Sequence, residues 1–509
     1  MFAYVIRRLG ISALVLAVST LLMYVLVSNS GDPLQDLYTD QSPNKQAKIE
    51  ARIDALDLDK PVLQRYSTWV QGVSGCVLPG AECDLGLTKS GRDVQPLLQQ
   101  ALTATLRLVL VAALLAALTG VGVGVLSAIR QYSAFDYGIT FVSFLFFSLP
   151  IFWVAVMLKQ YVAIGLNNWL RGPSFAPWVI ALAALAAGTV AAVALTEQWR
   201  RRAVVFTAAA AVTAGVLAYL SSVEWFARPS LGPVFVGLAG LAAAAVGVVL
   251  FSDFARRRVV IAAFVMGAGA LIAFFATGPV LTNPTWWHIA MLLGITTAVC
   301  VAAGWIIGGA LDREAAIKAS LFTGYCSGLA IFAHHVLAAF PSYSRKVAGR
   351  PVATIGSQTP GFNGNFWQVL LDQGLHVLLP TMALILITFA EFTRYTRSSM
   401  LEVLNQDYVR TARAKGLAER VVILRHAFRN ALIPVSTLVA ISFGALLGGA
   451  VITETVFGWR GMGRLFIDGL RDVDPNPVMA FYIVLAVAVM TANMIADVFY
   501  AYLDPRIRL

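Results

Sequence analysis

"ALTATLRLVLVAALLAALTGVGVGVLSAI", residues 101–129, is a continuous apolar stretch in which Arg107 is the one charged side chain. An α-helix rises about 1.5 Å per residue, so a stretch of this length can cross the roughly 30 Å of hydrocarbon in a bilayer. Its apolar residues are continuous rather than alternating, which is atypical of a transmembrane β-strand. The stretch therefore predicts a membrane-spanning helix.

The same pattern recurs along the whole chain. Of 509 residues, 58% are hydrophobic and only 13% charged, whereas a soluble protein of this size needs far more polar surface to cover its core. We therefore predict an all-α polytopic membrane protein with about twelve transmembrane helices. The predicted spans are Leu9–Val27, Ala101–Ile129, Tyr137–Ile164, Phe175–Leu195, Ala203–Leu220, Leu231–Phe251, Val259–Ala276, His288–Ala310, Ala316–Phe340, Gly374–Phe392, Ala431–Ile452 and Val478–Leu503.

Basic residues in the loops account for much of the net charge of +11. Counting helices from a cytoplasmic N-terminus places the basic loops 197–202, 253–258 and 311–318 inside, as cytoplasmic loops of membrane proteins usually are. No zinc spacing, recognition helix or aromatic–basic alternation favours a nucleic acid as partner. The loop after Phe340 is expected outside yet carries three basic residues, so it is an exception to the rule. Both termini are predicted to be cytoplasmic, and the first helix lacks a convincing cleavage site.

The four cysteines fall into two groups. Cys76 and Cys83 lie close together in the polar segment 29–99, which is expected outside, so they are candidates for a disulfide. Cys300 and Cys326 lie inside apolar runs, where packing is the simpler role. In the membrane, Glu391 and Arg394 are near the inner end of one helix, where they could pair, and Lys159 is expected to reach towards the outer face.

One cationic stretch interrupts the apolar sequence. "DYVRTARAKGLAERVVILRHAFRNALIPV", residues 407–435, reads as a short helix ended by Gly416 and a second short helix before Pro434. Two such helices at the cytoplasmic face would form a protruding, basic knob. On these residues alone, docking into a groove of a protein partner and lying on anionic lipid headgroups both remain open.

The residues around this knob resemble a known family. "MLEVLNQDYVRTARAKGLAERVVILRHAFRNALIPV", residues 400–435, resembles the coupling loop of bacterial ABC importer permeases of the dipeptide/oligopeptide/nickel family. The likeness covers roughly residues 1–165 and 370–509. The motif begins Arg410-Thr411-Ala412 where the generic importer has Glu-Ala-Ala, a wording usual for the peptide subclass. Further matching segments are "YVIRRLG" (4–10), "HVLLPTMALILITFAEFTRYTRSSMLEV" (376–403), "LGGAVITETVFGWRGMGRLFIDGLRDVDPNPVMA" (447–480) and "LDPRIR" (503–508).

The resemblance implies a division of the chain around a six-helix permease core. The helices between the two matching parts would be an insertion, and their even number leaves the orientation of later helices unchanged. The predicted parts are a first transmembrane helix (1–28), an extracytoplasmic segment (29–99), core helices two and three (100–165), about six inserted helices (166–345), an extracytoplasmic loop (346–373), core helix four (374–397), the coupling loop (398–430), and two last core helices with an outer re-entrant loop and a short cytoplasmic tail (431–509).

The resemblance also implies a function and partners. The chain would be the permease subunit of an ATP-driven importer for short peptides in the bacterial cytoplasmic membrane, forming half of the path and hydrolysing nothing itself. Its partners would be a second related permease, two cytoplasmic ATPase subunits or domains that hold ATP and magnesium, and an extracytoplasmic substrate-binding protein. No cofactor or metal is expected on this chain.

The resemblance assigns the ATPase contact to one set of residues. Separately, Gly444 and Gly448 form a small-x-x-x-small step that permits close helix packing. The coupling residues are Asp407, Tyr408, Arg410, Thr411, Ala412, Arg413, Ala414, Lys415, Gly416 and Leu417.

Two alternative functions remain open. A nickel or metallophore importer would share the fold, but no cluster of His, Cys or Met lines a predicted helix face, which favours peptides. A membrane enzyme such as a lipid-linked glycosyltransferase would need paired acidic residues near the outer surface. Asp32, Asp84 and Glu454 are available there, but the sequence does not pair them.

Overall fold

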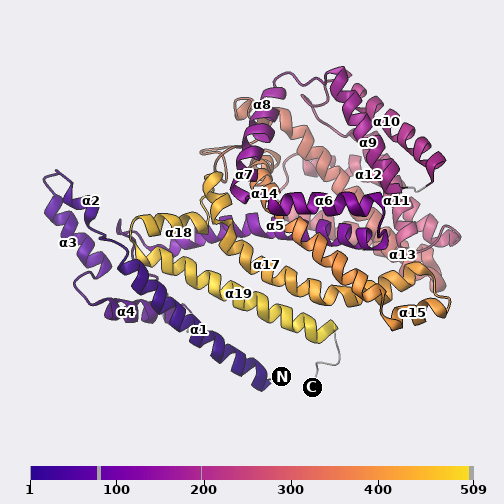
Figure 1. Ribbon diagram of the computed structural model, residues 1–509. Coiled ribbons are helices and arrows are strands. Elements are labelled where there is room, and N and C mark those ends of the chain that lie inside the picture. Colours follow the sequence, from indigo (N-terminus) through magenta and orange to yellow (C-terminus); the bar gives the residue numbers. More distant parts are fainter. Residues whose placement is uncertain (1, 77–81, 196–197, 504–509) are drawn as a thin grey trace. The chain divides into compact units, whose positions relative to one another are not determined.

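The computed structural model describes residues 2–76, 82–195 and 198–503 (Figure 1). Within these ranges the regular structure is helical and contains no strand, so the predicted all-α membrane fold is confirmed. The chain divides into two compact units. The first unit comprises Met1–Val162, Thr354–Ser357 and Val377–Leu509, and the second comprises Ala163–Ala353 and Gln358–His376.

The number of spans depends on how one long helix is counted. Among the described residues ten helices are long and apolar enough to cross a membrane, and the bent pair Ala134–Ser148 and Ile151–Trp169 makes eleven. Helix α13, Trp286–Lys346, has 61 residues, far more than one crossing needs. It breaks at Gly309, whose φ of 62° is left-handed, and Gly304 and Gly324 lie against Ile317 and Cys300 of the opposite arm. The two arms are therefore antiparallel, and counted separately they give the predicted twelve.

The core of the first unit forms around α5 and α17. Leu108 and Val109 of α5, Leu384 of α14, and Leu447 of α17 are buried together against Trp459. Figure 1 shows α17 beside α19, and α1 beside α19. The helices of this unit are α1 (Phe2–Ser28), α2 (Gln35–Tyr38), α3 (Lys45–Leu56), α4 (Val62–Gly75), α5 (Val94–Ile129), α6 (Ala134–Ser148), α7 (Ile151–Met157), most of α14 (Phe366–Leu404), α15 (Asp407–Ala414), α16 (Glu419–Val421), the π-helix η2 (Val422–Phe428), α17 (Arg429–Val456), α18 (Met462–Arg471) and α19 (Pro475–Leu503).

The second unit contains the helices predicted as an insertion. Small residues bring α11 and α12 into backbone contact, since a Cβ on Gly240 or Gly267 would collide with the carbonyl oxygen of the other. Ala244, Ala263 and Ala319 are fully buried beside them. Its elements are the π-helix η1 (Leu158–Ile164), which begins in the first unit, α8 (Gly165–Trp169), α9 (Pro177–Leu195), α10 (Trp199–Ser222), α11 (Gly232–Phe251), α12 (Arg257–Leu281), α13 and the start of α14.

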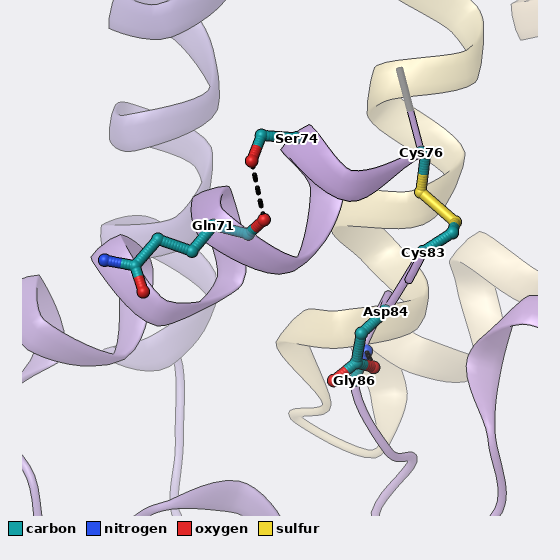
Figure 2. Close-up of a disulfide and its surroundings, with 6 residues drawn as sticks. All are labelled: Gln71, Ser74, Cys76, Cys83, Asp84 and Gly86. Atoms are coloured by element: carbon teal, nitrogen blue, oxygen red, sulfur yellow. Dashed lines mark hydrogen bonds between the residues drawn. A yellow bond between two sulfur atoms is a disulfide. The ribbon is translucent and has the colours of Figure 1, made fainter. Parts of the chain in front are cut away.

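The polar segment after α1 carries three short helices, α2 to α4. The structure joins Cys76, at the end of α4, to Cys83 in a disulfide with Cα atoms 4.2 Å apart (Figure 2). Beyond it, the Asp84 carboxylate accepts a hydrogen bond from Gly86 N at 2.8 Å, which shapes the turn towards α5. Cys300 is free and fully buried against Gly324, consistent with a packing role.

Candidate functional site

The cationic stretch folds into a compact knob, which we define as residues 405–421. It consists of α15, a turn at Gly416, and the one-turn helix α16. Gly416 has a φ of +76°, a left-handed conformation that suits glycine and ends α15 as predicted. A Cβ at this position would meet no atom within 4 Å, so the requirement for glycine is conformational rather than steric.

A small hydrophobic core holds the two sides of the knob together. Val409 and Ala412, three residues apart on α15, face Val422 at the start of η2, and Val403 and Leu404 at the end of α14 pack against them. Val409 and Val422 are fully buried, and Ala412 is only 6% exposed. The buried face of α15 therefore anchors it, and the opposite face is free for a partner.

An ion pair closes the turn from outside. Arg413 donates to both carboxylate oxygens of Glu419, with Nη2 2.7 Å from Oε1. Hydrogen bonding from the Arg413 guanidinium holds the pKa of Glu419 below its ordinary value. Both side chains are about half exposed, so the pair contributes modestly to stability. Its geometric role is to fix α15 relative to α16 across Gly416.

One further bond ties the knob to α17, and another joins α17 to α14. Asn430, in the first turn of α17, donates from Nδ2 to the Tyr408 hydroxyl at 2.9 Å. In α14, the Ser399 hydroxyl donates to the Ala431 carbonyl at 2.9 Å in a buried position. The knob is thus hydrogen-bonded to α17 and packed against the end of α14, rather than hanging on a loose loop.

A buried ion pair lies at the same end of α14 and was not predicted. Arg397 donates from Nε and Nη2 to the two oxygens of Asp136 at 2.6 and 2.7 Å, and Asp136 is only 1% exposed. The carboxylate also accepts from Ser127 Oγ and Tyr132 N. This bidentate pair links the turn between α5 and α6 to the helix that carries the knob.

Nine of the ten predicted coupling residues are exposed and one is not. Ala412 belongs to the small core described above, so its predicted place on a partner-facing surface is wrong. The exposed face of α15 and its turn is made of Asp407, Tyr408, Arg410, Thr411, Arg413, Ala414, Lys415, Gly416 and Leu417.

The second helix of the knob also differs from the prediction. Instead of a separate short helix ending near Pro434, α16, η2 and α17 follow one another without a break from Glu419 to Val456. The seven residues of η2 are a π-helix, a feature that often occurs at functional sites. The knob therefore continues directly into a transmembrane helix.

The intramembrane charge of Arg394 takes a partner other than the one expected. Among the described residues Arg394 forms no ion pair with Glu391, and its guanidinium lies over the ring of Phe147, 4.1 Å from the centroid. Such a cation–π contact stabilises the guanidinium charge by electrostatic attraction to the ring. The ammonium group of Lys159 is 3.5 Å from the Val456 carbonyl.

The predicted packing glycines face one helix. Gly444 and Gly448 of α17 lie against Val489 and Leu485 of α19, where an added Cβ would approach side-chain carbons to 3.0 and 3.3 Å. The small-x-x-x-small step thus serves packing within this chain.

The Glu454 carboxylate is held by hydrogen bonds within the fold. It is fully buried, and its carboxylate accepts from Thr105 Oγ1, from Gly463 N at 2.8 Å and from Arg464 N at 3.2 Å. It therefore caps the start of α18, where the helix dipole favours a negative charge. No second acid pairs with it among the described residues, so the geometry gives no support to the glycosyltransferase alternative.

The C-terminal third of the chain, residues 330–509, matches the family model described as "Binding-protein-dependent transport system inner membrane component". The matched residues include α14, the knob, α17, α18 and α19. The predicted family resemblance is therefore confirmed for this part of the chain.

Three relatives illustrate the likeness. The oligopeptide transport system permease protein OppB of Mycobacterium tuberculosis is 45% identical over 154 residues, which are 30% of this chain and 47% of that protein. AppB of Bacillus subtilis, also named an oligopeptide permease, is 46% identical over 138 residues, 27% of this chain and 44% of its own. The dipeptide transport system permease protein DppB of Escherichia coli is 45% identical over 148 residues, 29% of this chain and 42% of its own. The chain spans about half the length of the curated relatives it matches.

Proposed function

We propose that this chain is a permease subunit of an ATP-driven importer for short peptides in the bacterial cytoplasmic membrane. The proposal is supported by the family domain at residues 330–509 and by relatives that are named oligopeptide and dipeptide permeases. The single observation that carries it is the knob, an exposed basic helix anchored to two transmembrane helices. In this function ATP is hydrolysed by partner subunits, and the chain supplies half of the path.

We further propose that the exposed face of α15 docks into a groove of a cytoplasmic ATPase. Arg410 and Lys415 provide positive charge, and Tyr408 and Leu417, 42% and 41% exposed, provide apolar contact. Interfaces of this kind gain specificity from complementary charge and affinity from a few aromatic or aliphatic anchors. Movement of the ATPase would pass through α15 and the continuous helix from α16 to α17 into the membrane.

The remaining partners follow from the same proposal. They are a second related permease and an extracytoplasmic substrate-binding protein, with the knob on the cytoplasmic side and both termini inside. The α15 face favours a protein partner over lipid because its buried residues orient a narrow basic ridge outward, with small residues Thr411 and Ala414 between the charges. No observation in the structure favours a nickel substrate over a peptide.

Co-purification and transport test this proposal together. Arg410→Glu combined with Lys415→Glu is expected to lower co-purification of the ATPase subunits at least tenfold and to abolish ATP-driven uptake of a labelled tripeptide in proteoliposomes. Arg200→Glu, an exposed basic side chain at the start of α10, is the matched control and should change neither. Normal coupled uptake by the double variant would refute the assignment of the knob.

A further inference from the structure

Four arginines lie where helices α11, α12 and α13 of the second unit turn back on themselves. Arg256, Arg257 and Arg258 lie between the end of α11 and the first turn of α12. Arg313 follows Gly309, where the two arms of α13 meet. All four arginines are exposed, at an end of the unit that is predicted to be cytoplasmic. We call these four residues the arginine cluster.

Two contacts join the turns that carry the arginine cluster. Arg256 donates from Nη1 to the Asp312 carboxylate at 3.2 Å. The Arg258 guanidinium lies directly over Gly309, where an added Cβ would collide with Arg258 Nη1. The helix ends beneath these contacts are packed together by fully buried alanine and valine side chains. The cluster therefore stands on a rigid, close-packed base.

Three members of the cluster have hydrogen-bond donors that no described residue uses. Arg257, Arg258 and Arg313 form neither an ion pair nor a side-chain hydrogen bond with the described residues. Arg313 is nevertheless held in place, because its guanidinium carbon lies 4.9 Å from the centre of the Trp305 ring. A guanidinium group presents its N–H donors as a planar fork that matches two oxygens of a phosphate. The positioned forks of Arg258 and Arg313 are therefore preorganised for an anion.

The acidic residues near the cluster do not neutralise it. Segments 253–258 and 311–318 together carry five basic and three acidic side chains. Asp312 is paired with Arg256, and Glu314 is paired with Lys318. Asp253 is exposed and forms no ion pair with the described residues. The two turns thus keep an excess of positive charge that an anion would balance.

Exposed apolar side chains surround the cluster and favour a lipid as its ligand. Phe254 is 56%, Trp305 is 54% and Leu311 is 92% exposed. The connections between the helices are short here, so these side chains stay close to the ends of the transmembrane segments. Aromatic and basic residues at the ends of spans lie at the level of the lipid headgroups. An anion at this level, next to apolar groups, is the headgroup of a phospholipid.

We propose that the arginine cluster binds the headgroup of an anionic phospholipid. The phosphodiester oxygens accept hydrogen bonds from Arg258 and Arg313, and Arg257 adds positive charge at the rim. The exposed apolar side chains beside the cluster lie along the acyl chains. The site belongs wholly to the second unit, so it is independent of the proposed transport function.

Native mass spectrometry of the full chain, delipidated in detergent, tests the site. The probes are dioctanoyl phosphatidylglycerol, dioctanoyl phosphatidylcholine and inorganic phosphate. Phosphatidylglycerol should bind about tenfold more tightly than phosphatidylcholine, whose choline group neutralises the phosphate. Arg258→Gln combined with Arg313→Gln should weaken phosphatidylglycerol binding about tenfold. Arg200→Gln combined with Arg201→Gln removes the same charge from exposed residues outside the cluster and should leave binding unchanged.

Lysine variants separate a preorganised site from diffuse surface charge. Arg258→Lys combined with Arg313→Lys keeps the charge but loses the planar forks, so phosphatidylglycerol binding should still fall several-fold. Wild-type binding by this lysine variant, or an equal loss in the Arg200 and Arg201 variant, would overturn the site. Displacement of phosphatidylglycerol by an equal concentration of inorganic phosphate would overturn a lipid as the ligand.

A protein partner at the cluster would give a different result. Unchanged lipid binding by the glutamine variant of Arg258 and Arg313, together with loss of a co-purifying cytoplasmic subunit, would assign the cluster to that subunit and refute the lipid site. Thermal melting in the same detergent confirms that each variant is folded.

Discussion

Replacement of Gly416 by valine should uncouple peptide uptake from ATP hydrolysis. The residue has a φ of +76°, and no atom lies within 4 Å of the position that a Cβ would take. A larger side chain therefore meets no steric obstacle, and the whole effect must come from the backbone. For a non-glycine residue the left-handed conformation costs about 1–2 kcal/mol, and more for a β-branched one.

This cost is large relative to what holds the knob closed. The helix α15 has eight residues, and its core consists of Val409, Ala412 and Val422 with one half-exposed ion pair. A penalty of about 2 kcal/mol corresponds to a roughly 30-fold loss in the ratio of closed to open knob. Small exposed elements open locally at low free energy, so such a loss leaves a large fraction of molecules with an open knob.

The assay is the ratio of peptide imported to ATP hydrolysed by the reconstituted importer. Gly416→Val should lower this ratio several-fold, whereas Gly416→Asn should keep it near the wild-type value, because asparagine tolerates the left-handed region. Gly122→Val is the control for bulk, since Gly122 also faces open space but lies within α5 without a positive φ. If Gly416→Val couples as well as the wild type, the knob does not act through this turn.

Three further predictions concern burial. Arg397→Met leaves the Asp136 carboxylate buried without its partner and should destabilise the protein by about 3–5 kcal/mol, seen as a lower melting temperature in detergent; a wild-type melt would contradict the pairing. Ala412→Asp places a charge in the core of the knob and should speed tryptic cleavage there, whereas Ala414→Asp on the exposed face should not; equal cleavage would contradict the assigned faces. Burial raises the pKa of Asp474 to about 6 from 3.8, so the folded state keeps this proton to a higher pH than the unfolded state does. The free energy of unfolding should therefore fall by up to about 3 kcal/mol as the pH rises from 4 to 6. Asp474→Asn should remove this slope in pH-dependent melting, and an unchanged slope would contradict the assigned cause.

Local and one-dimensional features could be predicted from the sequence. Apolar runs fix the spans because the bilayer demands about 20 apolar residues wherever a helix crosses it. The turn at Gly416 was recognisable because glycine after a basic helix is a common C-terminal signal. The division of α13 was also predicted, as a gap between the runs His288–Ala310 and Ala316–Phe340, and the structure places the break at Gly309.

Contacts between distant segments could not be predicted. Asp136 and Arg397 are 261 positions apart, and nothing in either local pattern selects the other as partner. Arg394 lies three residues from Glu391, yet it lies over Phe147 because that ring comes from α6, packed beside α14. The burial of Ala412 had a local signal, since Val409 lies one turn earlier on the same face. Its outcome still depended on Val422 across the turn.

The structure also limits how the knob could transmit force. Because Glu419 to Val456 is one continuous helical path, a displacement of α15 must either move α17 as a whole or be absorbed within it. The packing of Gly444 and Gly448 against α19 resists bending in the C-terminal half of α17. The π-helix η2 precedes that packing in the chain. Because a π-helix departs from regular α-helical hydrogen bonding, a displacement of α15 would be absorbed there. Coupling by this chain therefore requires that the two bonds just after η2, from Asn430 to Tyr408 and from Ser399 to Ala431, keep the start of α17 fixed to the knob and to α14 while the knob moves.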